Sequence, residues 1–103
     1  MSDDPKSPDA CRTMRDVRAG VDAIDAALVD LLARRFGYMR AAARIKDSRS
    51  AVRDEVRKSE VIAAARAAAA QAGLPAEAIA HLWDDLVEAS IAYELEEWDR
   101  LRG

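Results

Sequence analysis

The feature that most constrains the fold is a long apolar repeat in the first half of the chain. Residues 11–46 contain no proline, and their apolar side chains recur at alternating steps of three and four. The repeat consists of Met14, Val17, Val21, Ile24, Leu28 and Leu31, continued by Arg35, Tyr38, Ala42 and Ile45. Because this spacing places the side chains on one side of an α-helix, it predicts one long helix over residues 11–46.

The composition favours helix along the whole chain. Of the 103 residues, 23 are Ala, 13 are Val, Ile or Thr, and five are aromatic. β-Branched and aromatic side chains favour strands, whereas Ala, Leu, Glu, Lys and Arg favour helices. An all-β or doubly wound fold is therefore excluded, and we expect an all-α chain.

Two further helices are expected after the long one. Residues 47–51 are polar, as in a loop, and a second helix should begin near Val52 to Asp54 and continue to Ala72. Gly73 suits the left-handed position that ends a helix, and Pro75 suits the first turn of the next helix. The third helix is expected over about residues 75–101, with apolar anchors at Ile79, Leu82, Trp83, Leu86, Tyr93 and Trp98.

The length of the first helix has a consequence for assembly. A helix of 36 residues is about 54 Å long, whereas a compact domain of this size has a diameter of about 35 Å. Part of its apolar side would then have no cover from its own chain. We therefore expect residues 11–103 to form a single three-helix domain within an intertwined homodimer, and residues 1–10 to be a disordered tail.

Composition also narrows the chemistry. Cys11 is the only cysteine and His81 the only histidine. This excludes an intramolecular disulfide, a cysteine-based zinc site and a histidine-dependent nucleophilic triad, and it fits a reducing cytoplasm. No stretch is apolar enough to span a membrane, and an isoelectric point near 5.1 argues against nucleic-acid binding. We expect no metal or cofactor, and a chemistry that uses Arg, Lys, Asp and Glu.

The net charge of −3 conceals an uneven distribution of charges along the chain. Residues 11–46 carry eight cations and four anions, whereas residues 76–103 carry two cations and eight anions. A basic and an acidic segment in one small domain are expected to lie against each other.

Cations occur where a helical core would be apolar. Arg35 takes a place in the repeat that Leu or Ile usually fills, and Lys46 follows eleven residues later on the same side of the helix. Either Phe36 replaces Arg35 in the core, or Arg35 needs an acid of another helix or an anionic ligand. Arg18 lies about 25 Å from Arg35 along the axis, so it can join such a site only in the partner chain of an antiparallel pair.

Two polar pairs stand at helical spacing in the later helices. Asp54 and Arg57 are three residues apart, as in a surface ion pair. Ser90 and Glu94 are four residues apart between apolar neighbours, where a carboxylate would gain from meeting cations of the first helix. Spacing alone leaves a structural salt bridge and a catalytic role equally open for Glu94.

An ordered set of residues runs through the chain, comprising Arg18, Asp25, Leu31 to Arg35, Lys46, Val52 to Asp54, Arg57, Gly73, Leu74, Ser90 and Glu94. This set, with its spacings, resembles the all-α (type II) chorismate mutases and the related isochorismate-pyruvate lyases, and the match covers about residues 14–101. The resemblance implies three helices per chain in an interlocked homodimer, without a cofactor.

The resemblance also implies roles for individual residues. Arg35, Lys46 and Arg57 would bind a small dicarboxylate substrate, joined by Arg18 of the partner subunit. Asp54 and Ser90 match positions that hold the hydroxyl-bearing part of the substrate. Lys46 and Glu94 match positions that contact the ether oxygen, so the expected catalytic residues are Lys46, Glu94 and Arg35.

The chemistry of such a mutase suits these residue types. The rearrangement of chorismate to prephenate is pericyclic, since a C–O bond breaks while a C–C bond forms, without a nucleophile, general base or metal. Fixed cations hold the two carboxylates, and a donor aimed at the ether oxygen stabilises the negative charge that develops there. Lys46 is the expected donor.

Two positions depart from the commoner family pattern. Many members have Gln where this chain has Glu94; an ionised carboxylate would repel the ether oxygen, whereas a protonated one could donate to it. We therefore expect activity to depend on a neutral Glu94. Lys58 stands where some mutases have an acid, which puts one polar contact to the substrate in doubt.

Several functions remain open at this point. The segment from Tyr38 to Lys46 and the tail with Tyr93 and Trp98 resemble the lyases, which release pyruvate from isochorismate and give salicylate, at least as closely. A mutase acting on 4-amino-4-deoxychorismate is a third possibility. A protein of another class, a non-catalytic helical dimerisation module, would pair Arg35 and Lys46 with acids of the third helix.

Overall fold

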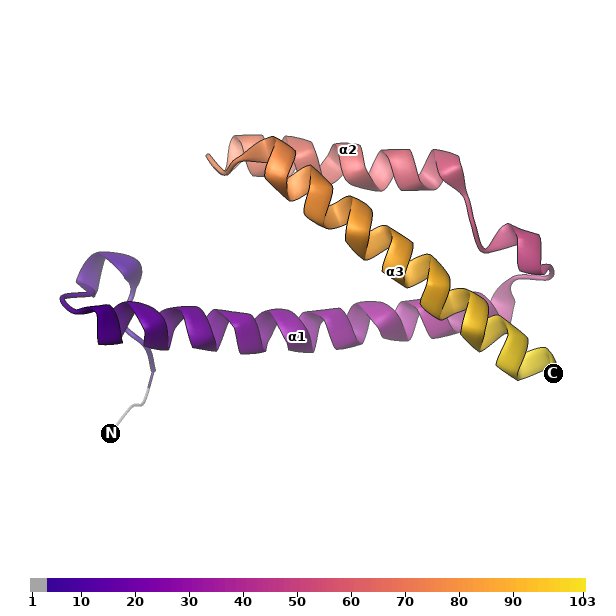
Figure 1. Cartoon of the computed structure of the whole chain (residues 1–103), viewed down its shortest axis with the longest axis horizontal. Coiled ribbons are helices and arrows are strands. Elements are labelled where there is room, and N and C mark those ends of the chain that lie inside the picture. Colours follow the sequence, from indigo (N-terminus) through magenta and orange to yellow (C-terminus); the bar gives the residue numbers. More distant parts are fainter. Residues whose placement is uncertain (1–3) are drawn as a thin grey trace. The chain divides into compact units, whose positions relative to one another are not determined.

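The computed structural model describes residues 4–103, and all its regular elements are helical (Figure 1). The elements are η1 (Pro8–Ala10), α1 (Met14–Ile45), η2 (Arg49–Ala51), α2 (Glu55–Gln71) and α3 (Ala76–Arg102). The described part of the chain contains no strand, and its first α-helix is the longest, which confirms the expected all-α class with three main helices. No helix in this part is long and apolar enough to cross a membrane.

The long helix begins three residues later than expected because the chain forms an N-terminal cap. The Oγ1 atom of Thr13 accepts a hydrogen bond from the backbone N–H of Asp16 at 3.1 Å, and Oδ2 of Asp16 accepts one from the N–H of Thr13 at 3.3 Å. This reciprocal arrangement satisfies two amide groups that a helix start otherwise leaves unpaired. α1 therefore starts at Met14, and the expected start at Cys11 is wrong.

α2 is bounded by two local signals of different kinds. Asp54, expected in its first turn, is instead the N-cap, and its Oδ1 accepts a hydrogen bond from the N–H of Arg57 at 3.0 Å. At the other end, Gly73 has a φ of 73°, and the N–H of Leu74 donates to the carbonyl of Ala69 at 2.8 Å. This is the glycine-ended helix stop that the sequence predicts at Gly73.

The chain divides after Arg35 into two compact units, and α1 contributes to both. In the first unit the apolar repeat is exposed, with Met14, Val17, Val21, Ile24, Leu28 and Leu31 keeping 38–61% of their surface accessible. A hollow beside the segment from Pro5 to Pro8 is lined by part of the same repeat. Of the predicted disordered tail, residues 1–3 lie outside the described residues, and the disorder of the tail and the single domain over residues 11–103 stay predictions.

The second unit, residues 36–103, has its core between α2, α3 and the segment that joins α1 to α2. Val52, Val87 and Ile91 are buried together, with Val61, Leu95 and Trp98 packed against them. Ala69 of α2 and Ala80 of α3 are 3% exposed, because their small side chains let the two helices pack closely. The alanine-rich stretch thus serves helix packing, as its composition suggests.

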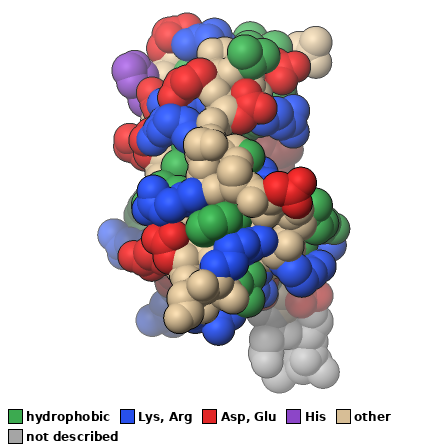
Figure 2. Space-filling view, turned by 90° about the vertical axis from the view of Figure 1, so that its right-hand side faces the viewer, with side chains coloured by type: hydrophobic (Ala, Val, Ile, Leu, Met, Phe, Trp, Pro, Cys, Tyr) green, Lys and Arg blue, Asp and Glu red, His purple; other side chains and the backbone are tan. Residues whose placement is uncertain are grey.

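Ion pairs of the second unit involve mainly acids of α3. Those that join a residue outside α3 to an acid of α3 are Arg49–Asp99, Arg53–Glu88, Lys58–Asp84, Lys58–Glu88, Arg66–Glu77 and Lys46–Glu94. Arg53 also pairs with Glu55, and Arg100 with Glu97. Most of the cations that pair with acids of α3 lie in residues 49–66. Lys46 is the residue of these pairs for which the expected contact between the basic segment 11–46 and the acidic segment 76–103 is confirmed. Figure 2 shows cations and acids interspersed on one face of the molecule.

Glu88 provides a testable pH dependence of stability. Hydrogen bonds from Arg53 and then from Lys58 lower the pKa of its carboxyl from 4.5 to about 2. A carboxyl whose pKa is lower in the folded state stabilises the fold fully above its unfolded pKa and loses this contribution as pH falls through its folded pKa. In urea unfolding at fixed protein concentration, Glu88→Gln should be less stable than wild type at pH 7, and the difference should shrink between pH 4.5 and pH 2. A difference that stays constant over that range would contradict this assignment.

Candidate functional site

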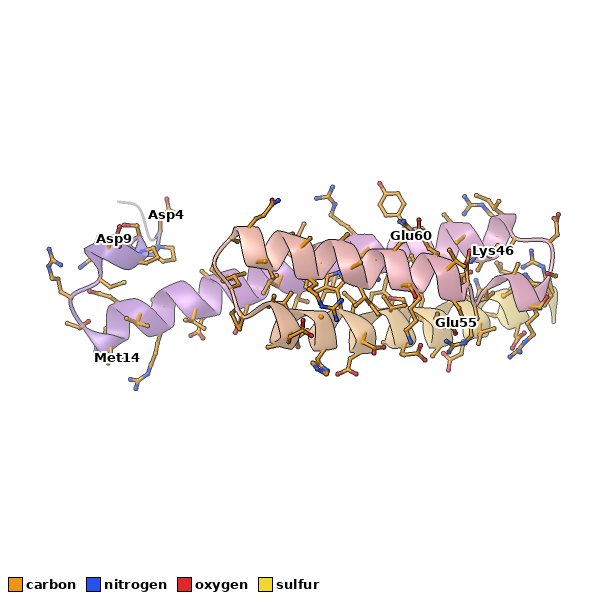
Figure 3. All side chains as sticks on the ribbon, turned by 90° about the horizontal axis from the view of Figure 1, so that it is seen from above. Asp4, Asp9, Met14, Lys46, Glu55 and Glu60 are labelled. Carbon is orange, nitrogen blue, oxygen red and sulfur yellow. The ribbon has the colours of Figure 1, made fainter. Side chains whose placement is uncertain are left out.

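Lys46 stands at the carboxyl end of α1 and meets a buried carboxylate of α3. Its backbone N–H still donates to the carbonyl of Ala42 at 2.9 Å, so it is the residue that caps the helix. Its Nζ lies 2.7 Å from Oε2 of Glu94. In Figure 3 Lys46 is labelled near Glu55, the first residue of α2. The Glu94 side chain is 5% exposed and the Lys46 side chain 29%, so the pair has one buried and one accessible member.

The environment of this pair leaves capacity for further polar contacts. The two charged atoms touch, yet Oε2 of Glu94 accepts no hydrogen bond of regular geometry from residues 4–103. Nζ of Lys46 also lies 3.4 Å from the carbonyl oxygen of Val52, in the segment before α2. An ammonium has three donors, so Lys46 can hold Glu94 and still donate to a ligand.

Ser90 lies one helical turn before Glu94 and is equally buried, at 3% exposure. Its Oγ donates to the carbonyl of Leu86 at 2.7 Å, within the same helix. The structure thus places both members of the predicted polar pair in the buried part of α3.

Asp54 and Arg57 are brought together, but not by the expected ion pair. The carboxylate of Asp54 caps α2 through the backbone N–H of Arg57. The guanidinium of Arg57 is exposed and forms no hydrogen bond or ion pair within the described chain. Lys58, the next residue, is 20% exposed at its side chain and pairs with Glu88 at 2.7 Å and Asp84 at 3.1 Å. Hydrogen bonds from Lys58, first to Glu88 and then to Asp84, raise its pKa.

Arg18 and Arg35 lie on α1 within the first unit. Arg18 is exposed and Arg35 is half-buried. The next residue, Phe36, belongs to the second unit and packs edge-on against Tyr93, with ring centroids 4.9 Å apart. Phe36 therefore packs against α3, as expected in the alternative in which Phe36 rather than Arg35 lies in the core. The convergence of Arg18 and Arg35 with Lys46 stays a prediction.

Two residues of α3 contact Lys46 that the sequence did not single out for this role. Nε1 of Trp98 donates to the carbonyl of Lys46 at 3.2 Å, and a guanidinium nitrogen of Arg102 donates to it at 2.9 Å. Trp98 was expected only as an apolar anchor. The available signal was spacing, since Ser90, Glu94, Trp98 and Arg102 follow one another at steps of four.

The arrangement defines what this site can do chemically. The buried side of α3 carries the carboxylate of Glu94 and the hydroxyl of Ser90, and the ammonium of Lys46, at the end of α1, contacts the carboxylate. Nothing in the cluster is a nucleophile paired with a base, so the groups suit binding and charge stabilisation. No group of three His, Cys, Asp or Glu within residues 4–103 is placed to hold a metal ion.

The sequence matches one known family and is similar to a protein with a known name. The sequence model of the family described as chorismate mutase type II matches residues 17–95. A protein of Pseudomonas aeruginosa named isochorismate pyruvate lyase is 31% identical over 98 residues, covering 95% of this chain and 97% of the lyase. Both matches include Lys46 and Glu94.

The Lys46–Glu94 pair predicts a specific stability pattern. Lys46→Met leaves the Glu94 carboxylate buried without a cation and should lower the free energy of unfolding by about 3 kcal/mol, measured in urea. Adding Glu94→Gln should recover most of this loss because the buried group is then neutral. Lys6→Met is the matched control: Lys6 pairs with Asp16 at 3.4 Å but is 55% exposed, so its loss should cost less than about 1 kcal/mol. Equal effects of the two lysine substitutions would contradict the assignment.

Proposed function

Because the chain belongs to the chorismate mutase type II family, we propose that it catalyses the pericyclic rearrangement of chorismate to prephenate. The observation that carries this proposal is the Lys46 ammonium held 2.7 Å from the buried Glu94 carboxylate. Membership of the family supports an enzyme of the isomerase or lyase class that acts on chorismate-like molecules. The particular reaction is the proposal.

Lys46 is the group that acts on the breaking bond. As the C–O bond of chorismate lengthens, negative charge develops on the ether oxygen, and a fixed ammonium stabilises that charge more in the transition state than in the substrate. Glu94 holds Lys46 in place and lies next to the same oxygen.

Cations around this pair would bind the two carboxylates of the substrate. The exposed guanidinium of Arg57 has no partner in residues 4–103 and supports a role in binding an anion. Arg35 and Arg18 of the partner subunit complete the set in our proposal, and Asp54 and Ser90 contact the hydroxyl-bearing part. Fixed cations of this kind hold a flexible dicarboxylate in the folded conformation that reacts.

A homodimer is part of the proposal. Leu28 and Leu31 in the first unit are 50% and 54% exposed, and the other members of the repeat before Arg35 are similarly uncovered. An apolar side of this length on one helix is suited to cover by the same helix of a second copy. A pair related by two-fold symmetry gives two equivalent sites.

The second candidate is release of pyruvate from isochorismate, which gives salicylate. It is favoured by the 31% identity to the isochorismate pyruvate lyase along nearly the whole chain. This reaction also breaks the bond to an ether oxygen, so Lys46 would serve it in the same way. A mutase for 4-amino-4-deoxychorismate and a dimerisation module without catalysis are the remaining alternatives.

The assay that tests the proposal follows prephenate from chorismate and salicylate from isochorismate. We expect prephenate to form, a loss of at least about 100-fold in kcat/KM for Lys46→Met, and retained turnover for Glu94→Gln, whose neutral amide can donate to the ether oxygen. Salicylate alone would replace the mutase assignment by the lyase. Turnover of neither substrate, with no binding of a dicarboxylate transition-state mimic, would leave the dimerisation module.

Mixing two inactive variants tests whether Arg18 acts across the dimer. Arg18→Ala and Lys46→Ala should each be inactive, but subunit exchange should restore about a quarter of wild-type activity, because each mixed dimer then holds one intact site. If Arg18 acts within its own chain, no mixed dimer contains an intact site. A mixture that remains inactive after exchange, checked by mass spectrometry, would contradict the intertwined arrangement.

A further inference from the structure

The carboxyl end of α1 is held by the last two turns of α3. A guanidinium nitrogen of Arg102 donates to the carbonyl of Ala43 at 2.9 Å, and the other donates to the carbonyls of Lys46 at 2.9 Å and Arg44 at 3.4 Å. Trp98 adds its Nε1–H to the Lys46 carbonyl at 3.2 Å. These contacts join residues 52–59 positions apart in the sequence, so they are tertiary and do not belong to either helix alone.

These contacts supply hydrogen-bond donors to the unpaired carbonyls at the end of α1. The last four carbonyls of an α-helix have no partner within the helix and carry the negative end of its dipole. The planar guanidinium of Arg102 supplies several donors and a positive charge at this place. It is itself fixed over the Trp98 ring, 4.3 Å from the ring centroid, as a cation–π contact.

Lys46 is thereby held at both ends by one helix. Its carbonyl is fixed by Trp98 and Arg102, and its ammonium is fixed by Glu94, which lies one turn before Trp98. A lysine side chain is flexible, so the position of its ammonium depends on the position of its backbone as well as on its ionic partner. A single straight helix that holds both ends sets the distance between them.

We propose that Trp98 and Arg102 are positioning residues that set the place of the Lys46 ammonium against Glu94. This inference rests on the proposed function, since it concerns the group assigned to the ether oxygen. Neither residue touches the substrate in this account; both act through the backbone of Lys46. Displacing a catalytic group by about 1 Å can lower a rate by about 100-fold, so a contact at the backbone has a kinetic effect.

The neighbouring Arg100 provides a matched control. It also lies in the last turn of α3, but it pairs with Glu97 of its own helix at 2.6 Å and makes no hydrogen bond to α1. A general effect of losing a cation near the end of α3 would appear in Arg100→Met as well. A positioning effect would appear in Arg102→Met and not in Arg100→Met.

The kinetic test uses Trp98→Phe, Arg102→Met, Arg102→Lys and Arg100→Met on whichever substrate the wild type converts. We expect kcat per folded enzyme to fall about 10-fold or more in Trp98→Phe and Arg102→Met, with KM changed less than about threefold, because the lost contact acts in the transition state. Arg102→Lys should recover part of the loss, and Arg100→Met should match wild type. If Arg102→Met does not fold, Trp98→Phe decides, since it removes the Nε1–H donor and keeps an aromatic side chain. Unchanged kcat in Trp98→Phe would overturn the proposal.

A second measurement is independent of catalysis. A double-mutant cycle in urea gives the coupling between Lys46 and Glu94 from Lys46→Met, Glu94→Gln and the double variant. We expect this coupling to fall at least by half in the Trp98→Phe background and to be unchanged in the Arg100→Met background. If the wild type converts neither substrate, the proposed function is wrong. The cycle would still test whether Trp98 positions Lys46 against Glu94. An undiminished coupling in Trp98→Phe would overturn it.

Discussion

The contact between a buried carboxylate and the end of a helix is the constraint on which the candidate site depends. Glu94 of α3 is almost fully buried, and burial of an uncompensated carboxylate is costly in free energy. Lys46 supplies the opposite charge at 2.7 Å, and it can do so because α1 ends at this point of α3. A change in the length of α1, or in the register of α3, would separate the two groups. The same contact that stabilises the second unit therefore fixes the geometry of the proposed chemistry.

α3 organises this arrangement by a local rule of helix geometry. Residues four apart lie along one side of a helix, so the hydroxyl of Ser90, the carboxylate of Glu94 and the indole of Trp98 follow one another on that side. Arg102 continues the series and reaches the carbonyls at the end of α1. One helix thus supplies a buried hydroxyl, an ionic partner for Lys46 and the cap of the helix that bears Lys46. This combination shows how a chain with a single histidine and a single cysteine places a charged pair and its supporting hydrogen bonds without either residue type.

The sequence predicts the helices well because their signals are local. The apolar repeat gives α1, and Gly73 gives the end of α2 at the residue where φ becomes positive. The boundaries at Thr13 and Asp54 were missed because a capping residue and a first-turn residue look alike until hydrogen bonds are seen. The partners of Lys46 lie 48 to 56 residues away, at Glu94, Trp98 and Arg102, and no local pattern encodes such contacts. Glu94 was singled out by its spacing from Ser90 between apolar neighbours and by its family position, whereas Arg102 was not found at all. The exposed apolar repeat of the first unit indicates that another surface packs on it, but not which one.

A crystal structure of the protein bound to a dicarboxylate mimic of the chorismate transition state would test the central claim most directly. Our account predicts the ether oxygen of the mimic within hydrogen-bond distance of Lys46, beside Glu94, with Arg35 and Arg18 of the partner subunit at its carboxylates. Lys46 should remain bound through its carbonyl to Trp98 and Arg102. A mimic seated away from Lys46, or a crystal and solution state with a single self-contained chain, would contradict the account.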